Sequence, residues 1–186
     1  YFIWSKVYTQ VHIAFADHKN ASGSFSHAVS FPSYAYDDKK KKGTLGKKLR
    51  IFASSESQLK DLNLSKWLSR LTYYGHITSI KEVPSNVKNY AVYRFKRPKG
   101  ESRLRKDIHK HAEYFAKEHN ISYEDALKRY EHRQVKPVYL PYVQMESLSQ
   151  QQRFKMFIEK TVCSESNPAS KFTAYGLSSE STVPEF

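Results

Sequence analysis

Apolar side chains at the start of the chain recur with the spacing of an amphipathic helix. The stripe repeats every four residues and consists of Ile3, Val7, Val11 and Phe15. Tyr8 and His12 are each displaced by one position onto its flank. Side chains four residues apart share one face of a helix, so this stripe predicts a helix that packs against a core. Because a domain rarely begins in the middle of such a pattern, we expect a strand to precede this helix.

Short apolar or alternating runs predict strands along the rest of the chain. They cover residues 28–31, 49–53, 77–83, 90–97, 139–147, 154–162 and 172–175. Runs of this length that end at proline, glycine or polar clusters are typical of strands. The polar loop with the lysine run 39–42 is instead interpreted as a mobile cationic arm.

Two helices are expected in addition to the first one and to the basic helix described below. Ser55 or Ser57 can cap a helix that reaches residue 71, with a break near Asn63. Its packing face consists of Leu59, Leu62, Trp67, Leu68 and Leu71. Ser122, followed three residues later by Asp125, predicts the start of a shorter helix that ends near Glu131.

The stretch from residue 90 to residue 117 is predicted to be a strand that leads into a basic helix. The period-two alternation ends at Pro98 and Gly100, so the helix should begin near Glu101 or Ser102. Its packing stripe is predicted to be Leu104, Ile108, His111 and Phe115. A separate stripe of the same helix carries Arg103, Lys106, Lys110 and Lys117. One side therefore packs and the other carries charge.

The order of these elements favours an α+β fold. If one strand precedes the first helix, the order becomes strand, helix, strand, strand, helix, strand, which is the ferredoxin-like arrangement shared by RNA-recognition domains. We therefore expect a ferredoxin-like domain over residues 1–97, without its first strand in this sequence. A smaller α/β domain with the basic helix is expected over residues 98–186.

The positive charge of the chain is confined to two segments. The net charge is +13, and residues 39–50 contribute seven Lys or Arg and no acid. Residues 94–110 contribute a further excess of six, carried by Arg94, Lys96, Arg97, Lys99, Arg103, Arg105, Lys106 and Lys110. With 39% hydrophobic residues the chain is a folded protein, not a basic tail. Charge in two patches indicates a defined footprint for a polyanion, most simply nucleic acid.

Other interpretations of the basic segments are weaker. Long cations can simply solvate an exposed helix, but here strand, loop and helix are all basic together, which solubility does not require. No run approaches the length of about 20 apolar residues that spans a membrane, and no stretch pairs a basic face with a broad apolar face. Helix-turn-helix spacing, expected of a DNA-binding regulator, is also not found. A single cysteine, Cys163, fits a reducing cytoplasm.

Metal-dependent and nucleotide-dependent catalysis find little support in the residues. His109 and His111 are two residues apart and diverge on a helix, and Asp37 and Asp38 lie in a lysine-rich loop. No GxxxxGK loop is present. RNA cleavage needs no metal, because the 2′-hydroxyl can attack the adjacent phosphate when a base removes its proton. Among eight histidines, His12 at the edge of the first helical stripe is a candidate, although a structural role is the more common one there.

Several short motifs, taken together and in order, resemble one known family. They are Val29-Ser30-Phe31-Pro32, Leu45-Gly46 followed by Leu49-Arg50-Ile51 and Ala53-Ser54, and Tyr175-Gly176-Leu177-Ser178 with the ending Val183-Pro184 and Phe186. They are similar to the Csy-type CRISPR repeat-processing endoribonuclease of type I-F systems, over nearly the whole chain.

The resemblance implies a fold, an activity and partners. It implies a ferredoxin-like N-terminal domain and a C-terminal domain whose basic helix enters the major groove of a repeat RNA hairpin. The family cuts at the 3′ side of the stem-loop without metal or another cofactor and leaves a 2′,3′-cyclic phosphate. It holds the product in a type I-F effector complex with other protein subunits, in the prokaryotic cytoplasm and not on a membrane.

The resemblance also assigns roles to residues. Val11-His12-Ile13-Ala14 matches the family's catalytic histidine context, so His12 becomes the expected base. Ser147 takes the role of the serine that holds the attacking 2′-hydroxyl, and Tyr175 matches a tyrosine near the histidine. Phe154 is expected to stack on the last base pair of the stem. From the residues alone, Ser147 is a turn residue, Phe154 a core aromatic and Tyr175 a packed strand residue.

The basic segment departs from the family pattern. Arg94 fits a base-reading arginine, but Lys96 stands where the family has a glutamine, and lysine cannot make the two-sided contact of glutamine to adenine. One extra residue near 98–102 leaves the register of the helix open by one. The helix is also less rich in arginine, with Asp107 and His109 mixed in, so specificity is affected more than affinity.

Two functions remain open from the sequence. The first is a hairpin-specific, metal-independent endoribonuclease with His12 as base and Ser147 as the positioning residue. The alternative is a non-catalytic subunit that binds the RNA hairpin of a guide ribonucleoprotein. Both predict tight, salt-sensitive RNA binding, and they differ in whether His12 is needed for a cut.

Overall fold

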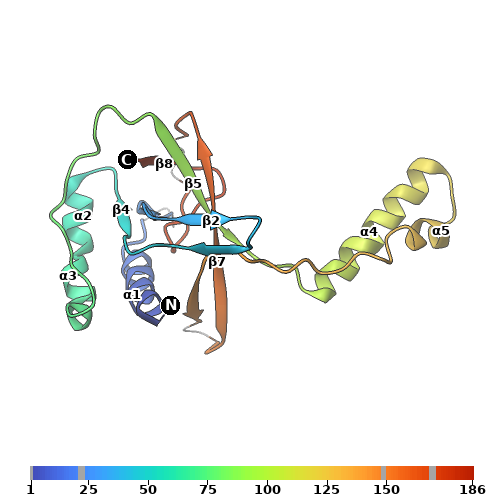
Figure 1. The fold of residues 1–186 in the computed structure, drawn as a ribbon, viewed down its shortest axis with the longest axis horizontal. Coiled ribbons are helices and arrows are strands. Elements are labelled where there is room, and N and C mark those ends of the chain that lie inside the picture. The colour runs from blue at the N-terminus through green and yellow to red at the C-terminus, as the bar shows by residue number, and fades with distance from the viewer. Residues whose placement is uncertain (1, 21–23, 148–149, 168–170) are drawn as a thin grey trace. The chain divides into compact units, whose positions relative to one another are not determined.

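The structure is a computed structural model that describes residues 2–20, 24–147, 150–167 and 171–186. Contacts divide the chain into two compact units. Unit 1 contains residues 1–96 and 139–186, and unit 2 contains residues 97–138 (Figure 1). The strands after residue 139 therefore belong to the same unit as the first helix, although the sequence grouped them with the basic helix. The division into independently folding domains 1–97 and 98–186 stays a prediction.

Unit 1 holds most of the regular elements. Its helices are α1 (Phe2–Asp17), α2 (Glu56–Leu62), α3 (Leu64–Trp67) and the short 3-10 turn η1 (Ser69–Leu71). Its strands are β1 (Ala28–Ser30), β2 (Ala35–Asp37), β3 (Lys42–Thr44), β4 (Arg50–Phe52), β5 (Asn89–Lys96), β6 (Tyr142–Glu146), β7 (Arg153–Cys163) and β8 (Val183–Glu185). Within the described residues the strands form antiparallel pairs β1–β4 and β2–β3 and a four-stranded antiparallel sheet in the order β6-β7-β5-β8.

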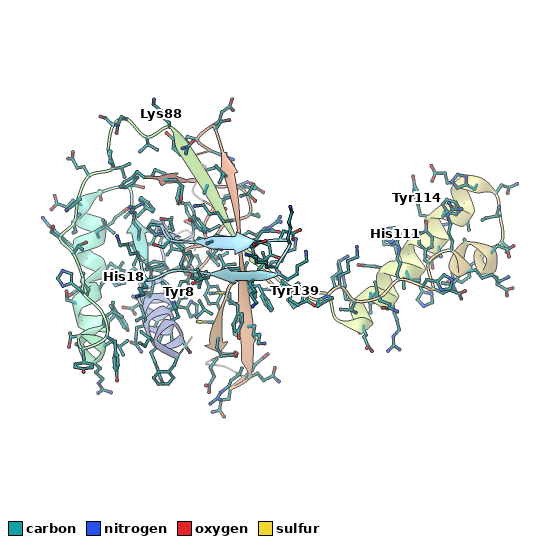
Figure 2. All side chains as sticks on the ribbon, viewed as in Figure 1. Tyr8, His18, Lys88, His111, Tyr114 and Tyr139 are labelled. Atoms are coloured by element: carbon teal, nitrogen blue, oxygen red, sulfur yellow. The ribbon has the colours of Figure 1, made fainter. Side chains whose placement is uncertain are left out.

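Helix α1 confirms the first prediction, with a shift in its packing face. The buried residues are Tyr8, Val11, Ala14 and Phe15. Ile3 is 46% exposed and does not belong to the core. A four-residue repeat drifts around a helix of 3.6 residues per turn, so the early members of the stripe leave the face that packs. Tyr8 points from α1 into unit 1, as Figure 2 shows.

The predicted helix over residues 55–71 is broken where the sequence indicated. Ser55 caps α2 by accepting a hydrogen bond from the backbone N–H of Gln58. Asn63 has a φ of 45°, in the left-handed region, and separates α2 from α3. Asparagine tolerates this conformation because its short polar side chain bonds locally, here to the N–H of Lys66. Helix α3 contacts α1 (Figure 1).

Three strand and loop predictions are wrong. Residues 77–83 form no strand, and Ile77, Ile80 and Val83 are exposed. Residues 172–175 are a turn with one isolated bridge, Phe25 to Phe172, because they lie across α1 instead of along a strand. The supposed mobile arm is the β2–β3 hairpin, in which Asp37 pairs with Lys42.

The four-stranded sheet has one face in the core. On β5, Ala91 and Tyr93 are buried, whereas Arg94 and Lys96 alternate onto the other face. Val143 and Met145 of β6 and Met156 and Ile158 of β7 complete this side, against which α1 packs. Strand β8, which the sequence pattern did not predict, pairs with the start of β5. The α+β class is confirmed, and the ferredoxin-like arrangement stays a prediction.

Unit 2 is a helical pair, α4 (Glu101–His119) and α5 (Tyr123–Lys128). Both predicted starts are confirmed, and Ser122 caps α5 by accepting from the N–H of Asp125. The buried residues are Ala112, Ala116 and Ala126, whereas His111 is exposed. His111 was therefore wrongly placed in the packing stripe, because the close approach of α5 selects a small side chain one position later. In the described part of the chain, no helix is both long and apolar enough to cross a membrane.

Candidate functional site

Three residues spaced by four along α1 hold the chain segments that lie against that helix. The indole Nε1–H of Trp4 donates to the carbonyl of Gly46, with an N···O distance of 3.0 Å. The hydroxyl of Tyr8 donates to the carbonyl of Tyr175 at 2.7 Å. Nδ1 of His12 lies 2.9 Å from the carbonyl oxygen of Ala174. The helical repeat therefore fixes His12 against the turn that contains Tyr175.

This turn is shaped by its own hydrogen bonds and by one glycine. The N–H of Gly176 donates to the carbonyl of Thr173, and the N–H of Thr173 donates to that of Leu177. Gly176 has a φ of 68°, and a Cβ atom built there would lie 2.8 Å from both Phe15 and Val29. Only glycine fits this position without strain. The turn thus presents two consecutive carbonyl groups, of Ala174 and Tyr175, to α1.

The contact with Ala174 decides the tautomer of His12. A carbonyl oxygen can only accept, so Nδ1 carries the proton and donates it. In the neutral ring, Nε2 is then unprotonated and can take a proton from another group. The ring of Tyr175 lies flat against the imidazole, with centroids 4.1 Å apart and planes 14° apart. His12 is half-buried, so it is held in place without being closed off.

The hydroxyl of Tyr8 acts here only as a donor. Complete burial raises the pKa of Tyr8, and the nearby Tyr175 raises it further. The hydroxyl therefore stays protonated and holds the carbonyl of Tyr175 in place.

Ser147 follows β6 directly and begins a tight turn. Its N–H donates to the carbonyl of Gln152 at 2.9 Å, and its carbonyl accepts from the N–H of Gln151 at 2.8 Å. Its Oγ accepts from the N–H of Gln150 at 3.3 Å. Residues 148 and 149, which belong to the same predicted motif, lie outside the described residues. Because α1 packs against β6, Ser147 and His12 belong to adjoining elements of unit 1.

A hollow of about 370 Å³ lies between α1 and the strand pair β6–β7. Its wall combines polar and charged groups from both elements: Phe2, Ser5, Lys6, Tyr142, Gln144, Met145, Glu146 and Arg153. Glu146 pairs with Arg153 at 3.6 Å, at the end of the strand pair that precedes and follows the Ser147 turn. The surface beside the candidate serine is therefore concave and polar.

Phe154 lies on the core side of β7. It pairs in register with Met145 of β6, and its ring centroid is 6.2 Å from that of Phe95. The ring is half-buried and packs against the main core of unit 1. This packing matches the core interpretation, and the stacking of Phe154 on an RNA base pair stays a prediction.

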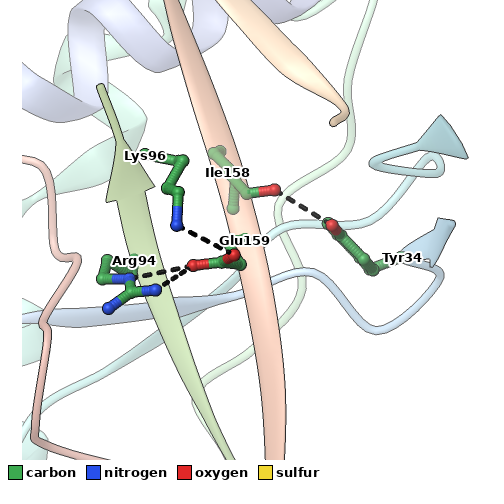
Figure 3. A network of polar contacts seen from close by, with 5 residues as sticks. All are labelled: Tyr34, Arg94, Lys96, Ile158 and Glu159. Carbon is green, nitrogen blue, oxygen red and sulfur yellow. Dashed lines mark hydrogen bonds and ion pairs between the residues drawn. The ribbon is translucent and has the colours of Figure 1, made fainter. Parts of the chain in front are cut away.

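Arg94 and Lys96 converge on one carboxylate that the sequence analysis did not single out. Arg94 and Glu159 are paired directly across β5 and β7, and Nε of Arg94 donates to Glu159 at 2.9 Å (Figure 3). Arg94 makes a second contact to the same oxygen through its terminal nitrogen. Nζ of Lys96 lies 3.4 Å from the other oxygen.

The two cations determine the charge state of Glu159. Partial burial alone would raise the pKa of this carboxyl, but the hydrogen bonds and charges of Arg94 and Lys96 outweigh it and lower the pKa overall. Glu159 is therefore ionised near neutral pH. It offsets part of the positive charge that the sequence assigned to this end of β5.

In unit 2, the basic residues differ in how they are paired. Lys99 and Arg103 both reach Asp107, at 2.6 and 3.4 Å, and Arg105 reaches Glu101 at 3.6 Å. The hydrogen bond from Lys99 lowers the pKa of Asp107, with further help from the charge of Arg103.

Lys106 and Lys110 are exposed on α4 and form no ion pair with the residues that the structure describes. Arg97, at the start of unit 2, is exposed as well. Apart from Phe154, the predicted RNA-binding residues are therefore surface cations on β5 or on unit 2. Among the described residues, no group of three or more His, Cys, Asp and Glu side chains is arranged to hold a metal ion.

Comparison with known proteins agrees with the resemblance in the sequence. A match to the family described as "CRISPR-associated protein (Cas_Csy4)" covers residues 1–186. A protein of Pseudomonas aeruginosa (strain UCBPP-PA14) named "CRISPR-associated endonuclease Cas6/Csy4" is 30% identical over 166 residues, which cover 89% of this chain and 82% of that protein. A protein of the same name from Escherichia coli (strain UTI89 / UPEC) is 29% identical over 143 residues, 76% of this chain and 72% of that protein. This chain therefore belongs to the Cas_Csy4 family of CRISPR-associated proteins.

Proposed function

We propose that this chain is a metal-independent endoribonuclease that cuts CRISPR repeat RNA at the 3′ base of a hairpin. The relatives described above are named CRISPR-associated endonucleases, which supports the reaction class. The observation that carries the proposal is the contact between Nδ1 of His12 and the carbonyl of Ala174, 2.9 Å away. This contact leaves Nε2 as a base on a fixed ring.

The reaction uses the RNA itself as nucleophile. Nε2 of His12 takes the proton of the 2′-hydroxyl, and the 2′-oxygen attacks the adjacent phosphorus. The bond from phosphorus to the 5′-oxygen of the next nucleotide breaks, and that oxygen takes up a proton. The products are a 2′,3′-cyclic phosphate and a 5′-hydroxyl end. No oxidant, metal or cofactor is needed for this balance.

Ser147 and Tyr175 act as partners of this base. The backbone of Ser147 is held in a closed turn by Gln151 and Gln152, so its hydroxyl has a defined origin from which to orient the 2′-hydroxyl. The stacked ring of Tyr175 limits rotation of the imidazole. A ring that is held in the reactive orientation avoids part of the entropic cost of reaching it.

The stem is bound by surface cations. Lys106 and Lys110 are exposed and neutralise phosphates, and the neighbouring cations on α4 and on the segment before it extend the contact. A cut at the 3′ base leaves the whole stem on one product. All stem contacts therefore persist after cleavage, which supports a chain that stays bound to the mature guide RNA in an effector complex with other subunits.

The test uses the purified protein and a labelled RNA stem-loop from a type I-F repeat, incubated in EDTA and resolved on a denaturing gel. We expect one cut at the 3′ base of the stem, blocked by a 2′-deoxy nucleotide before the scissile phosphate. A gel shift without any cut would overturn the endonuclease and favour the hairpin-binding subunit. A cut that also occurs in the 2′-deoxy RNA would contradict 2′-hydroxyl attack.

A further inference from the structure

The second basic segment of the chain forms a structured projection on unit 1. Strands β2 and β3 pair as a hairpin whose turn spans residues 38–41. Oδ1 of Asp37 accepts from the backbone N–H groups of Lys39 and Lys40, at 3.0 and 3.1 Å. Lys41 has a φ of 50°, which closes the turn. These local bonds give the lysines of the turn a defined backbone.

The hairpin is also anchored to the body of unit 1. A Cβ atom at Gly43 would lie 2.7 Å from Pro141, so the backbone of β3 packs directly on the residue that precedes β6. Leu45, directly after β3, is 3% exposed and belongs to the core. Trp4 donates to the carbonyl of Gly46 at 3.0 Å. The hairpin is thus held at its base by the core and by α1.

The anchored hairpin presents cations that the protein does not neutralise. Residues 37–48 contain six lysines and two aspartates. Lys40 and Lys41 pair with Asp37 and Asp38, at 3.8 and 2.7 Å. The remaining lysines of the segment are exposed and form no ion pair with the described part of the chain: Lys39, Lys42, Lys47 and Lys48. Four unpaired cations on a fixed backbone fit a row of phosphates.

The position of the hairpin on α1 relates it to the candidate base. Trp4, which contacts Gly46, lies eight residues before His12 on the same helix. With a rise of about 1.5 Å per residue, the two positions are about 12 Å apart along the helix axis. Phosphates of one strand rise by about 3.4 Å each in a duplex, so this distance spans a few phosphates. The cations are therefore within reach of a strand whose phosphate lies at His12.

We propose that the β2–β3 hairpin, with the two lysines after it, is a second RNA-binding site. It binds the sugar-phosphate backbone of single-stranded RNA next to the cleaved bond, outside the stem. The inference rests on the proposed cleavage at His12, because that cleavage brings RNA to unit 1. Binding is independent of sequence, since exposed lysine ammonium groups contact phosphates and not base edges.

The experiment measures RNA binding at a series of KCl concentrations. The RNAs are the minimal stem-loop, the same stem-loop with a 5′ extension and the same with a 3′ extension, all with a 2′-deoxy nucleotide at the cut. The proteins are the unmodified chain and the double variants Lys39→Gln/Lys42→Gln and Lys47→Gln/Lys48→Gln. The matched control is Lys81→Gln/Lys88→Gln, which removes the same charge from an exposed segment of the same unit.

We expect a steeper salt dependence for one extended RNA than for the minimal stem-loop. On that RNA each hairpin variant should reduce the slope of log K against log [KCl] by about 1.4, because each lost phosphate contact on a single strand is worth about 0.7. The slope on the minimal stem-loop should not change. The extension that responds identifies the 5′ or the 3′ strand as the ligand.

Three results would overturn the inference while leaving the cleavage proposal intact. These are equal slopes on all RNAs, the same loss in the control as in the hairpin variants, or the same loss on the minimal stem-loop as on the extended RNA. A failure of the proposed function has a different signature. In that case the unmodified chain does not cut the all-ribose stem-loop, and the RNA site next to the cut fails with it.

Discussion

The ring of Tyr175 covers one face of the imidazole of His12, at a centroid distance of 4.1 Å, while the main chain of the same turn holds the ring edge through Ala174. The two contacts act on different properties. The carbonyl fixes which nitrogen carries the proton, and the aromatic ring fixes the plane of the imidazole. A base that is held in both respects needs no rearrangement before it takes a proton.

Replacing Tyr175 separates stacking from the role of its backbone. Tyr175→Phe keeps the ring and should retain nearly full cleavage, whereas Tyr175→Leu should slow single-turnover cleavage roughly 2- to 12-fold, the range of about 0.5 to 1.5 kcal/mol for an aromatic pair. RNA affinity should stay the same in both variants. Equal, large losses in Tyr175→Phe and Tyr175→Leu would instead indicate that the hydroxyl takes part in the reaction.

Replacing His12 tests the base itself. Asparagine can donate to the carbonyl of Ala174 but cannot accept a proton as Nε2 does, so His12→Asn should preserve the fold and lower the cleavage rate by about 10²- to 10⁴-fold. Stem-loop affinity should not change. The exposed His76→Asn is the matched control and should cleave normally. Full activity of His12→Asn would remove His12 from the reaction.

Gly176 is the position where one added methyl group should matter most. In Gly176→Ala the new Cβ meets Phe15 and Val29 at 2.8 Å and the backbone keeps a φ of 68°, so we expect a loss of roughly 1 to 3 kcal/mol in the free energy of unfolding. Urea unfolding measures it. Gly75→Ala, where nothing lies within 4 Å, should change stability by less than about 0.5 kcal/mol. Equal midpoints for the two variants would contradict this packing.

Local signals in the sequence were sufficient for the helices. The cap at Ser122 and the break at Asn63 depend on residues within a few positions, and both are confirmed. Strands depend on partners that are distant in the sequence. Residues 77–83 have the composition of a strand but lack a neighbour, whereas Asp37 and Lys42, polar as they are, pair because the turn between them closes well.

The same distinction applies to the candidate site. His12 could be selected from its helical position together with the family resemblance, because both are visible in the sequence. Glu159 could not, since its relation to Arg94 arises from the register of β5 and β7, 65 residues apart in the chain. Ala174 contributes only a backbone carbonyl, which no residue type reveals.

The stability of unit 1 should depend on pH through His27. Burial lowers the pKa of this histidine, the carbonyl of Gln58 partly opposes the shift, and His18, with its ring 6.5 Å away, adds to it. In the unfolded chain the pKa is about 6.5, so below that pH the unfolded state binds the proton more readily. The free energy of unfolding should therefore be constant above about pH 7 and fall with acidification below about 6.5.

The pH effect can be assigned with one substitution. His27→Phe keeps an aromatic ring against Phe15, which stacks on His27 at 5.2 Å, but does not titrate. Thermal melts between mildly acidic and neutral pH should show a weaker pH dependence in His27→Phe than in the unmodified chain. The exposed His132→Gln should keep the full dependence. Identical pH profiles for His27→Phe and the unmodified protein would exclude His27 as the cause.

Glu159 is expected to restrain RNA binding by Arg94 and Lys96. Glu159→Gln keeps the shape of the side chain but removes the charge that both cations contact. RNA affinity at low salt should rise about fivefold, since two unit charges 4 Å apart in water interact by about 1 kcal/mol. Stability should change little, because exposed ion pairs are worth about 0 to 1 kcal/mol.

The control for this prediction is Glu165→Gln, an equal change of charge at an exposed position of unit 1. If net charge alone matters, both variants gain affinity equally, and Glu159 has no special role. If Glu159 instead holds Arg94 in the orientation that contacts RNA, affinity falls in Glu159→Gln while it rises in Glu165→Gln. Only a gain that is confined to Glu159→Gln, together with a steeper salt slope, supports restraint, because it requires that the released cations find phosphates of their own.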